Sequence, residues 1–370
     1  MKQSILLCCL LSICSFTIAQ QKDTTTISSD TVVISIDTVT IKKDTVTIIG
    51  VGDIMMGSNY PDGAVLPPDN GSILMKDVAS VLSSADVTMG NLEGVLLNDG
   101  GTPKTCKDPK VCYVFRSPES YVQNLTASGF DLMSVANNHA GDFGDVGRRS
   151  SMKTLGEAGL EYAGQITKPY TTFTRDSIRY GFAAFAPNGG CVNLNDLAGA
   201  KAIVAHLDSI SDVVIISFHG GAEGAQYQHV PRINEIFHGE NRGNVYDFAH
   251  QLIDAGADII FGHGPHVTRA VEVYKDRFIS YSLGNFCTYG GINVAGVSGL
   301  APIIKVFTNP EGAFYKAQIT STYQTFRAPV KIDPEKRVLK RIQELTKQDF
   351  PENTYTIDNE GWINPSTIPR

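Results

Sequence analysis

The chain has 370 residues, of which 42% are hydrophobic and 19% are charged, as is typical of a globular protein with a substantial core. The 31 Lys and Arg residues against 38 Asp and Glu residues give a formal net charge of −7. Because the sequence contains no basic cluster of the kind that follows a phosphate backbone, nucleic acid is not expected as a partner.

The first 19 residues are predicted to be a signal peptide that is cleaved after Ala19. A positively charged start is followed by an apolar run at residues 5–13 and by a small-residue cleavage site. The alternative is a membrane anchor, but this run is shorter than the ~20 apolar residues that span a bilayer. No small residue precedes any cysteine of this segment, which argues against lipidation. We therefore expect a secreted or periplasmic protein without a transmembrane helix after cleavage.

Residues 20–44 are predicted to form a linker rich in Thr and Asp. A short motif recurs at intervals of seven residues, beginning at Asp30, Asp37 and Asp44, and its last copy runs into the first core strand. The repeats alternate as strands do but carry few large apolar side chains. A tether or a loosely docked edge ribbon is therefore expected.

Residues 45–308 are predicted to form one α/β domain with a layered sheet core flanked by helices. Short β-branched runs alternate here with helical segments. The expected strands are 46–51, 86–89, 132–135, 180–185, 213–218, 259–261 and 278–281. The expected helices are 75–83, 118–128, 148–158 and 245–255, and Gly129, Gly159 and Gly256 are natural stops after the last three.

Residues 309–370 are predicted to form a C-terminal extension with one helix. Asp333 is the expected N-cap and Pro334 the first helical residue, and the apolar residues Val338, Leu339, Ile342 and Leu345 share one face. A polar tail follows. Trp362, the only Trp of the chain, is expected to dock against the core rather than to contact a substrate.

Four cysteines lie outside the predicted signal peptide: Cys106, Cys112, Cys191 and Cys287. Cys106 and Cys112 would close a short loop, and disulfides persist in an oxidising compartment, so we favour a disulfide between them. A thiolate metal site is the alternative, but nothing nearby supplies the remaining ligands.

Five polar clusters follow directly after predicted strands: Gly52-Asp53, Asn91-Leu92-Glu93, Asn137-Asn138-His139, His219-Gly220-Gly221 and His263-Gly264-Pro265-His266. Each alone is compatible with a helix cap, a turn or a structural histidine. Because the carboxyl ends of strands in an α/β sheet form the ligand crevice, all five are expected to converge. Together they predict a metal site.

The ligand types limit the metal. Asp, Glu, Asn and His without Cys suit divalent Mn, Fe or Zn, and carboxylate bridging favours two ions ~3.5–4 Å apart. Such a pair can lower the pKa of a bridging water and bind both the attacking and the leaving oxygen of a phosphoryl group. The sequence leaves the choice among the three metals open.

At these residues the chain resembles the calcineurin-like metallophosphoesterases and, among them, the CapA-type poly-γ-glutamate capsule biosynthesis family. The resemblance covers residues 46–306 and implies a calcineurin-like metallophosphoesterase fold. Its motifs are Gly52-Asp53-Ile54-Met55-Met56-Gly57, Asn91-Leu92-Glu93-Gly94, Ala136-Asn137-Asn138-His139 with Asp142 and Gly144, Ser217-Phe218-His219-Gly220-Gly221-Ala222-Glu223, Gly262-His263-Gly264-Pro265-His266-Val267 and Tyr281-Ser282-Leu283-Gly284-Asn285-Phe286.

The resemblance implies a role for each matching residue. Metal ligands would be Asp53, Glu93, Asn138, His219 and His266, with Glu93 as the bridge between two ions. His139 would donate a proton to the leaving group, since an imidazole that titrates near neutrality can protonate an alkoxide or an amine. A role of His139 as a ligand or as a turn residue stays open.

The chain departs from the family pattern at three positions. Many relatives carry His where this chain has Gly264, so either His263 replaces that ligand from one residue earlier or the site has one ligand fewer. Many relatives carry Trp in place of Gly220, which would alter packing beside His219. Met55 stands where many phosphoesterases have a second His ligand.

A second group of residues could orient the ligands or hold an anionic substrate, and each is equally compatible with an ordinary cap or ion pair. These residues are Asn91, Asn137, Asp142, Glu223, Arg116, Arg269 and Asn285.

Three functions are compatible with this pattern. The first is a secreted metallohydrolase acting on a phosphoester or an amide. The second is a protein that handles a poly-γ-glutamate-like anionic polymer during synthesis, export or attachment, including by amide transfer. The third is a non-catalytic envelope protein stabilised by its metals. The full ligand set with His139 argues against the third, while the altered histidine pair leaves it open, and envelope partners are not specified.

Overall fold

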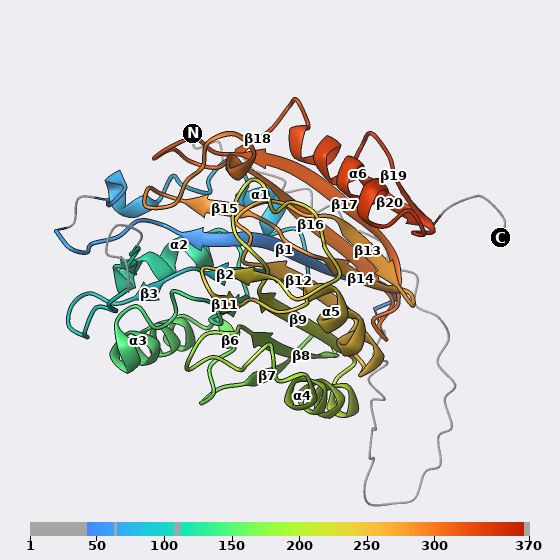
Figure 1. The fold of residues 1–370 in the computed structure, drawn as a ribbon, viewed down its shortest axis with the longest axis horizontal. Helices are drawn as coiled ribbons and strands as arrows, with labels where there is room; N and C mark the ends of the chain where they lie inside the picture. Colours follow the sequence, from blue (N-terminus) through green and yellow to red (C-terminus); the bar gives the residue numbers. More distant parts are fainter. Residues whose placement is uncertain (1–42, 63–64, 107–111, 366–370) are drawn as a thin grey trace, which may run out of the picture. The chain divides into compact units, whose positions relative to one another are not determined.

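Two β-sheets face each other across a shared apolar core in the computed structural model, which describes residues 43–62, 65–106 and 112–365 (Figure 1). The predicted signal peptide and residues 20–42 of the predicted linker lie outside the described residues. No helix among the described residues is long and apolar enough to span a membrane.

The first sheet carries the N-terminal strand at its centre. Its order is β19-β20-β17-β16-β1-β2-β5-β6, and β15 also pairs with β1 and β18 with β17. The pairs β1–β2, β2–β5, β5–β6 and β1–β15 are parallel, and the others are antiparallel. The strands span β1 Val46–Met55, β2 Val87–Leu92, β5 Leu132–Ser134, β6 Glu161–Ala163, β15 Asn285–Thr288, β16 Leu300–Thr308, β17 Phe314–Tyr323, β18 Lys331–Ile332, β19 Tyr355–Ile357 and β20 Trp362–Pro365.

The second sheet has the order β13-β14-β12-β9-β8-β7. Its four inner strands are parallel, and an antiparallel strand closes each edge. The strands span β7 Tyr170–Arg175, β8 Ile178–Phe185, β9 Val213–His219, β12 Ile259–His263, β13 Val271–Tyr274 and β14 Arg277–Ser280. All residues of β9 and β12 are buried, as expected for parallel strands covered on both faces.

Alternation of side chains along the strands builds three apolar layers. In β1, Val46 and Ile48 point into the core between the sheets, whereas Ile49 and Val51 belong to the layer under the first helices. In β9, Ile215 lies in the core between the sheets and Ile216 in the layer under α4 and α5. Both sheets are therefore fixed in register by two buried faces.

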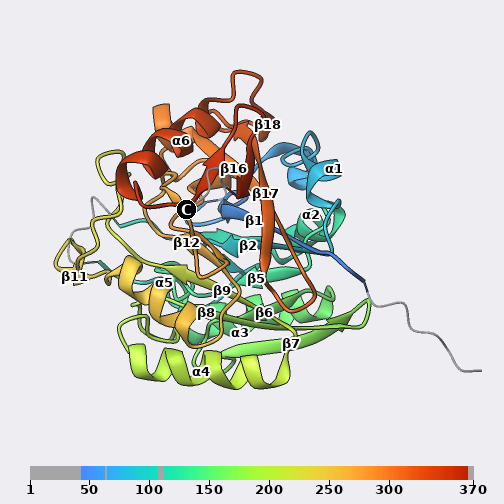
Figure 2. The ribbon, with the colours of Figure 1, turned by 90° about the vertical axis from the view of Figure 1, so that its right-hand side faces the viewer.

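Helices cover the outer faces of both sheets. Residues of α1 (Ala79–Leu82), α2 (Val122–Ala127) and α3 (Gly144–Glu157) pack on the first sheet, and those of α4 (Leu197–Ile210) and α5 (Val245–Asp254) pack on the second (Figure 2). The last helix, α6 (Arg337–Asp349), contacts β13, β16 and β17. Shorter elements are η1 Pro68–Gly71, β3 Val95–Leu96, β4 Arg116–Ser117, η3 Glu119–Tyr121, β10 Ile236–Phe237, β11 Glu240–Asn241 and η4 Gly296–Gly299.

The predicted layered α/β fold is confirmed. The seven predicted strands correspond to β1, β2, β5, β8, β9, β12 and β14. The helix predicted at 75–83 is regular only at Ala79–Leu82, and the one predicted at 118–128 consists of η3 followed by α2. The sequence analysis did not predict α4 or the strands β17 to β20, which extend the first sheet.

The predicted start of the late helix is wrong by three residues. Lys336 has a left-handed φ of 52° and precedes the first helical residue, Arg337. The Asp333 carboxylate accepts the backbone N–H groups of Glu335 and Arg337, at 3.3 and 2.9 Å. Asp333 and Pro334 therefore form a turn before the helix. Trp362 lies in β20, with its ring 5.9 Å from that of Phe307, so it packs on the sheet.

Candidate metal centre

The polar clusters meet where parallel strands of the two sheets end. Asp53 lies in β1 beside Asn91 of β2 and Asn285 of β15, and His219 and His263 are paired last residues of β9 and β12. Glu93, His139 and His266 follow β2, β5 and β12 directly or within a few residues. The convergence expected from the strand order is thus present in the described structure.

Gly52 allows the close backbone contact that places Asp53. A Cβ at this position would lie 2.0 Å from the Gly284 carbonyl oxygen, so no other residue fits without movement of the backbone. The Asp53 N–H donates to the same oxygen at 2.8 Å. This contact fixes Asp53 next to the start of β15, which carries Asn285.

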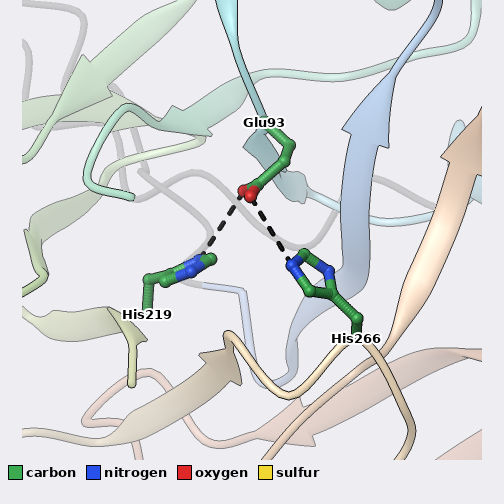
Figure 3. A group of neighbouring side chains, drawn as sticks. All are labelled: Glu93, His219 and His266. Carbon is green, nitrogen blue, oxygen red and sulfur yellow. Dashed lines mark ion pairs between the residues drawn. The ribbon is translucent and has the colours of Figure 1, made fainter. Parts of the chain in front are cut away.

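Two carboxylates and three imidazoles lie together at this point. The Asp53 oxygens are 3.3 Å from His263 Nδ1 and 2.9 Å from His266 Nδ1. The Glu93 oxygens are 3.6 Å from His219 Nδ1 and 3.8 Å from His266 Nε2 (Figure 3). One ligand atom each of Glu93, His219 and His266 lies within 4.8 Å of the other two, a spacing that one metal ion can bridge.

Three asparagines hold the carboxylates and His266 in place. Asn91 Nδ2 donates to Asp53 Oδ1 at 2.9 Å and to Glu93 Oε2 at 2.7 Å, and Asn137 Nδ2 donates to Asn91 Oδ1 at 3.0 Å. Asn285 Oδ1 lies 3.1 Å from His266 Nδ1, and its Nδ2 donates to the His266 carbonyl at 3.0 Å. These amide groups orient the candidate ligands through hydrogen bonds.

Burial and mutual charge shift the pKa values of the candidate ligands. Burial would raise the pKa of Asp53, but the adjacent His263 and His266 imidazoles bring it well below its usual range. Burial, with the Asp53 charge, raises the pKa of Glu93 to about 8. Burial alone would lower the pKa of His266, yet its contacts with Asp53 raise it to about 10. Burial and the nearby Arg242 charge lower the pKa of His219, which favours the neutral imidazole that metals bind.

Several buried polar atoms of this cluster have no hydrogen-bond partner in the described structure. Since nearly all buried polar atoms in folded proteins are paired, such atoms require another partner. They are Glu93 Oε1, both ring nitrogens of His219, both ring nitrogens of His263, and Asn138 Oδ1. A divalent cation would supply that partner, and oxygen and imidazole donors without thiolate suit Mn, Fe or Zn. The residues therefore fit a metal centre.

Two of the departures from the family pattern lie against each other. Gly264 has a φ of 116°, and a Cβ there would lie 2.5 Å from the Gly220 carbonyl oxygen. The Gly220 N–H donates to the His263 carbonyl at 2.9 Å. A side chain at 264 would require this backbone contact to shift, whereas His263 is fully buried with its ring beside Asp53.

His139 and Asp142 form a second polar group. Nδ1 of His139 lies 2.8 Å from Asp142 Oδ2, and the ring lies 4.3 Å from that of Phe115. Because a carboxylate only accepts hydrogen bonds, Nδ1 carries the proton of this contact and Nε2 is left for another partner. Burial lowers the pKa of His139 although Asp142 raises it.

The remaining predicted residues fall into two groups. Glu223 pairs with Arg242 at 2.9 Å, and its charge contributes to the raised pKa of Glu93, so it lies near the cluster. Arg116 donates to Asn59 at 2.5 Å and lies 4.8 Å from the centre of the Phe143 ring. Arg269 is fully buried in an ion pair with Glu235. The structure thus does not bring these two arginines to the candidate ligands.

Three residues near the centre were missed by the sequence analysis. Lys104 lies 2.6 Å from Asp142, Phe115 packs against the His139 ring, and the buried Arg242 lies near His219. All three belong to irregular segments or to the residues next to very short strands, so no strand-end signal marks them. Cys106 and Cys112, between Lys104 and Phe115, are joined by a disulfide, and Cys191 and Cys287 are free and buried.

Comparison with known proteins gives consistent results. Residues 47–289 match the family model described as bacterial capsule synthesis protein PGA_cap. The chain is 29% identical over 256 residues to the capsule biosynthesis protein CapA of Bacillus anthracis, a match that covers 64% of this chain and only 58% of that protein. It is 28% identical over 315 residues to the PGA biosynthesis protein CapA of Bacillus subtilis (strain 168), covering 80% and 77%.

Solved structures with a related chain path include a hypothetical protein from Thermus thermophilus, with a TM-score of 0.46 and 14% identity over 75% of this chain and 100% of that one. The NAD nucleotidase of Haemophilus influenzae aligns with a TM-score of 0.41 and 11% identity, over 82% of this chain and 56% of that one. The family match covers most of the described residues and includes all the candidate ligands. The chain belongs to the bacterial capsule synthesis protein PGA_cap family.

Proposed function

We propose that this chain is a secreted metal-dependent hydrolase that acts on a poly-γ-glutamate-like capsule polymer during its synthesis, export or attachment. The cluster of Glu93, His219 and His266, in which Glu93 and His219 are buried and carry ligand atoms without a hydrogen-bond partner, is the observation that carries the proposal of metal-dependent chemistry. The family and the names of its capsule and PGA biosynthesis relatives support the polymer as the substrate.

The proposed metal ligands are the residues of this cluster. Two divalent cations of the Mn, Fe or Zn type would be held by Asp53, Glu93, Asn138, His219, His263 and His266. Glu93 is proposed to bridge them, since its two oxygens face different histidines at 3.6 and 3.8 Å. His263 is proposed to replace the family ligand that Gly264 lacks. When bound, such metals lower the pKa of water and stabilise negative charge on a phosphoryl or carbonyl oxygen.

His139 is proposed to protonate the leaving group. In hydrolysis the bond to the leaving group breaks, water supplies the oxygen of the other product, and the leaving atom takes up a proton. The Nδ1–H of His139 is committed to Asp142 at 2.8 Å, so Nε2 is the atom that can deliver this proton. Burial among Phe115 and the loop residues shields that transfer from bulk water.

The same layout serves a phosphoester or a γ-glutamyl amide, because both reactions require charge stabilisation on an oxygen and a protonated leaving group. An elemental analysis of the purified protein, coupled to a hydrolysis assay with phosphodiesters and γ-glutamyl amides, tests the proposal. We expect stoichiometric divalent metal and metal-dependent hydrolysis of at least one substrate class. Metal without hydrolysis would indicate a stabilised envelope protein, and transfer to an amine without hydrolysis would indicate a transferase.

Secretion is part of the proposal. Cleavage after Ala19 would remove the signal peptide and leave the Thr/Asp-rich linker of residues 20–44 ahead of the domain. The Cys106–Cys112 disulfide supports an oxidising compartment. N-terminal sequencing of the protein recovered from outside the cytoplasm should begin at Gln20. An uncleaved or lipid-modified N-terminus would contradict this part of the proposal.

A further inference from the structure

We propose that Lys104 is a positioning residue for the proton donor. Its ammonium group holds the buried Asp142 carboxylate, and through that carboxylate it fixes the orientation of the His139 ring. The catalytic consequence rests on the proposed function, whereas the positioning itself is a property of the folded chain and can be measured without any reaction.

Lys104 makes four contacts with the loop of His139. Its Nζ lies 2.6 Å from Asp142 Oδ1 and 3.2 Å from His139 Nδ1, and it donates to the Asn138 carbonyl at 3.4 Å. Its backbone N–H donates to the Asp142 carbonyl at 2.8 Å. The Asp142 side chain is 0% exposed and that of Lys104 is 27% exposed, so the cation reaches inward from the surface to a carboxylate that water does not reach.

The two oxygens of Asp142 have different partners. Oδ2 accepts from the Phe115 N–H at 2.6 Å and contacts His139 Nδ1 at 2.8 Å, and Oδ1 faces Lys104. Without the ammonium group, Oδ1 would be left buried with no counter-charge, which is unfavourable. The carboxylate would then turn toward water or another donor. Since Oδ2 would move with it, the hydrogen bond that sets the His139 ring would weaken.

The disulfide closes the segment that carries these contacts. Lys104 precedes Cys106 by two residues, and Phe115, whose ring centre lies 4.3 Å from that of His139, follows Cys112 by three. Both ends of the segment therefore contact the His139–Asp142 pair. The disulfide limits how far these ends can separate, and so we expect it to support the position of Lys104.

A histidine NMR experiment tests the positioning directly. In protein labelled with ¹⁵N-histidine, the His139 Nδ1–H signal is assigned by its loss in His139→Ala. We expect a protected Nδ1–H signal in the wild type and in Lys104→Arg, and its loss through exchange in Lys104→Met. Lys275→Met, at an exposed ion pair with Asp254, is the matched control and should leave the signal unchanged. A signal that persists in Lys104→Met would overturn the proposal.

Leaving-group dependence tests the catalytic consequence. With a poor leaving group, Lys104→Met should lower kcat by ~10–100-fold, as substitutions of residues that orient a functional side chain commonly do. KM and metal content should be unchanged. With a good leaving group the loss should be small, and Lys104→Arg should recover most of the rate. A raised KM at unchanged kcat, or equal losses for both leaving groups, would show that Lys104 does not act through His139.

The disulfide provides a second variant should Lys104→Met not fold. The double variant Cys106→Ser/Cys112→Ser keeps Lys104. It should increase the exchange of the His139 Nδ1–H and lower kcat for the substrate with the poor leaving group, as is expected for Lys104→Met. An unchanged signal in this double variant would refute the role of the disulfide. If the wild type hydrolyses none of the substrates, the proposed function fails, while the NMR comparison still decides the role of Lys104.

Discussion

Arg269 and Glu235 form a two-point ion pair in the protein interior, with Nη1 2.8 Å from Oε1 and Nη2 2.7 Å from Oε2. Arg269 also donates to the Tyr227 carbonyl at 2.8 Å, and Glu235 accepts the Ala222 N–H at 3.0 Å. The pair therefore ties the loop after His219 to the segment after His266.

Removing one partner of this pair should be strongly destabilising. Glu235→Gln leaves the fully buried Arg269 guanidinium without a counter-charge, which typically costs ~3–5 kcal/mol of unfolding free energy. Urea denaturation measures the change. Asp254→Asn, which disrupts the exposed Lys275–Asp254 pair, is the control and should have little effect. Equal stability of Glu235→Gln and wild type would show that the pair is dispensable.

Asp258 should make stability depend on pH. Its carboxylate accepts the Val214 N–H at 2.7 Å and pairs with Arg277, yet burial dominates and raises its pKa to about 7. Between pH ~4 and 7 the folded protein holds a proton that the unfolded chain has released. The stabilisation from this proton is complete below pH ~4 and is lost as the pH rises to 7, on the order of 4 kcal/mol in total.

Asp258→Asn isolates this effect because an amide does not ionise. Urea denaturation of both proteins across pH 4.5 to 8 measures the free energy of unfolding of each. As the pH rises to ~7, this free energy should fall for the wild type relative to Asp258→Asn, and above pH ~7 the difference between the two proteins should stay constant. Parallel pH profiles of the two proteins would mean that Asp258 is already ionised at low pH.

His139→Ala should separate proton transfer from metal binding. The variant should keep most of its metal, because His139 contacts Asp142 and not the candidate ligands. Its turnover should fall by the ~10²–10⁴-fold expected for a positioned general acid, with a smaller loss for substrates whose leaving groups need no proton. Metal loss as complete as in Asp53→Ala would make His139 a ligand instead.

Strand ends were the most predictable part of the site. Asp53, His219 and His263 end or nearly end β-branched runs that form buried parallel strands, so the sequence alone predicts that they converge at the carboxyl ends of these strands. Glu93 follows from the same reasoning at β2. The packing of the two sheets against each other, rather than local sequence, then sets the distances between these side chains, which explains why the sequence pattern indicated a metal centre but not which atoms face each other.

Contacts made by irregular segments could not be predicted in the same way. The contact of Lys104 with Asp142 depends on a loop path set by tertiary packing and a disulfide, and no periodic pattern encodes it. The same holds for Arg242, which follows the two-residue strand β11. The sequence analysis named Arg269 as a candidate for substrate binding, and only the structure shows that its side chain is buried in an ion pair with Glu235.

Two of the regular elements that the sequence analysis missed, α4 and β17, were missed for different reasons. In α4 the buried residues Ala200, Val204 and Leu207 have helical spacing, so this helix could have been predicted from the apolar pattern of the sequence. In β17 the polar residues Lys316, Gln318 and Thr320 weaken the apolar signal, and the strand is stabilised by pairing with β16 along its whole length. Such pairing is a tertiary property that β propensity does not report.

The most direct test of the proposed metal centre is the metal content of variants in the cluster. Asp53→Ala, Glu93→Ala and His219→Ala each remove a buried candidate ligand and leave its neighbours unpaired. Elemental analysis after equal loading with Mn, Fe or Zn should find about two ions per chain in the wild type and in Asp254→Asn, and a marked loss in the three cluster variants. Wild-type metal content in all three would contradict the proposed centre.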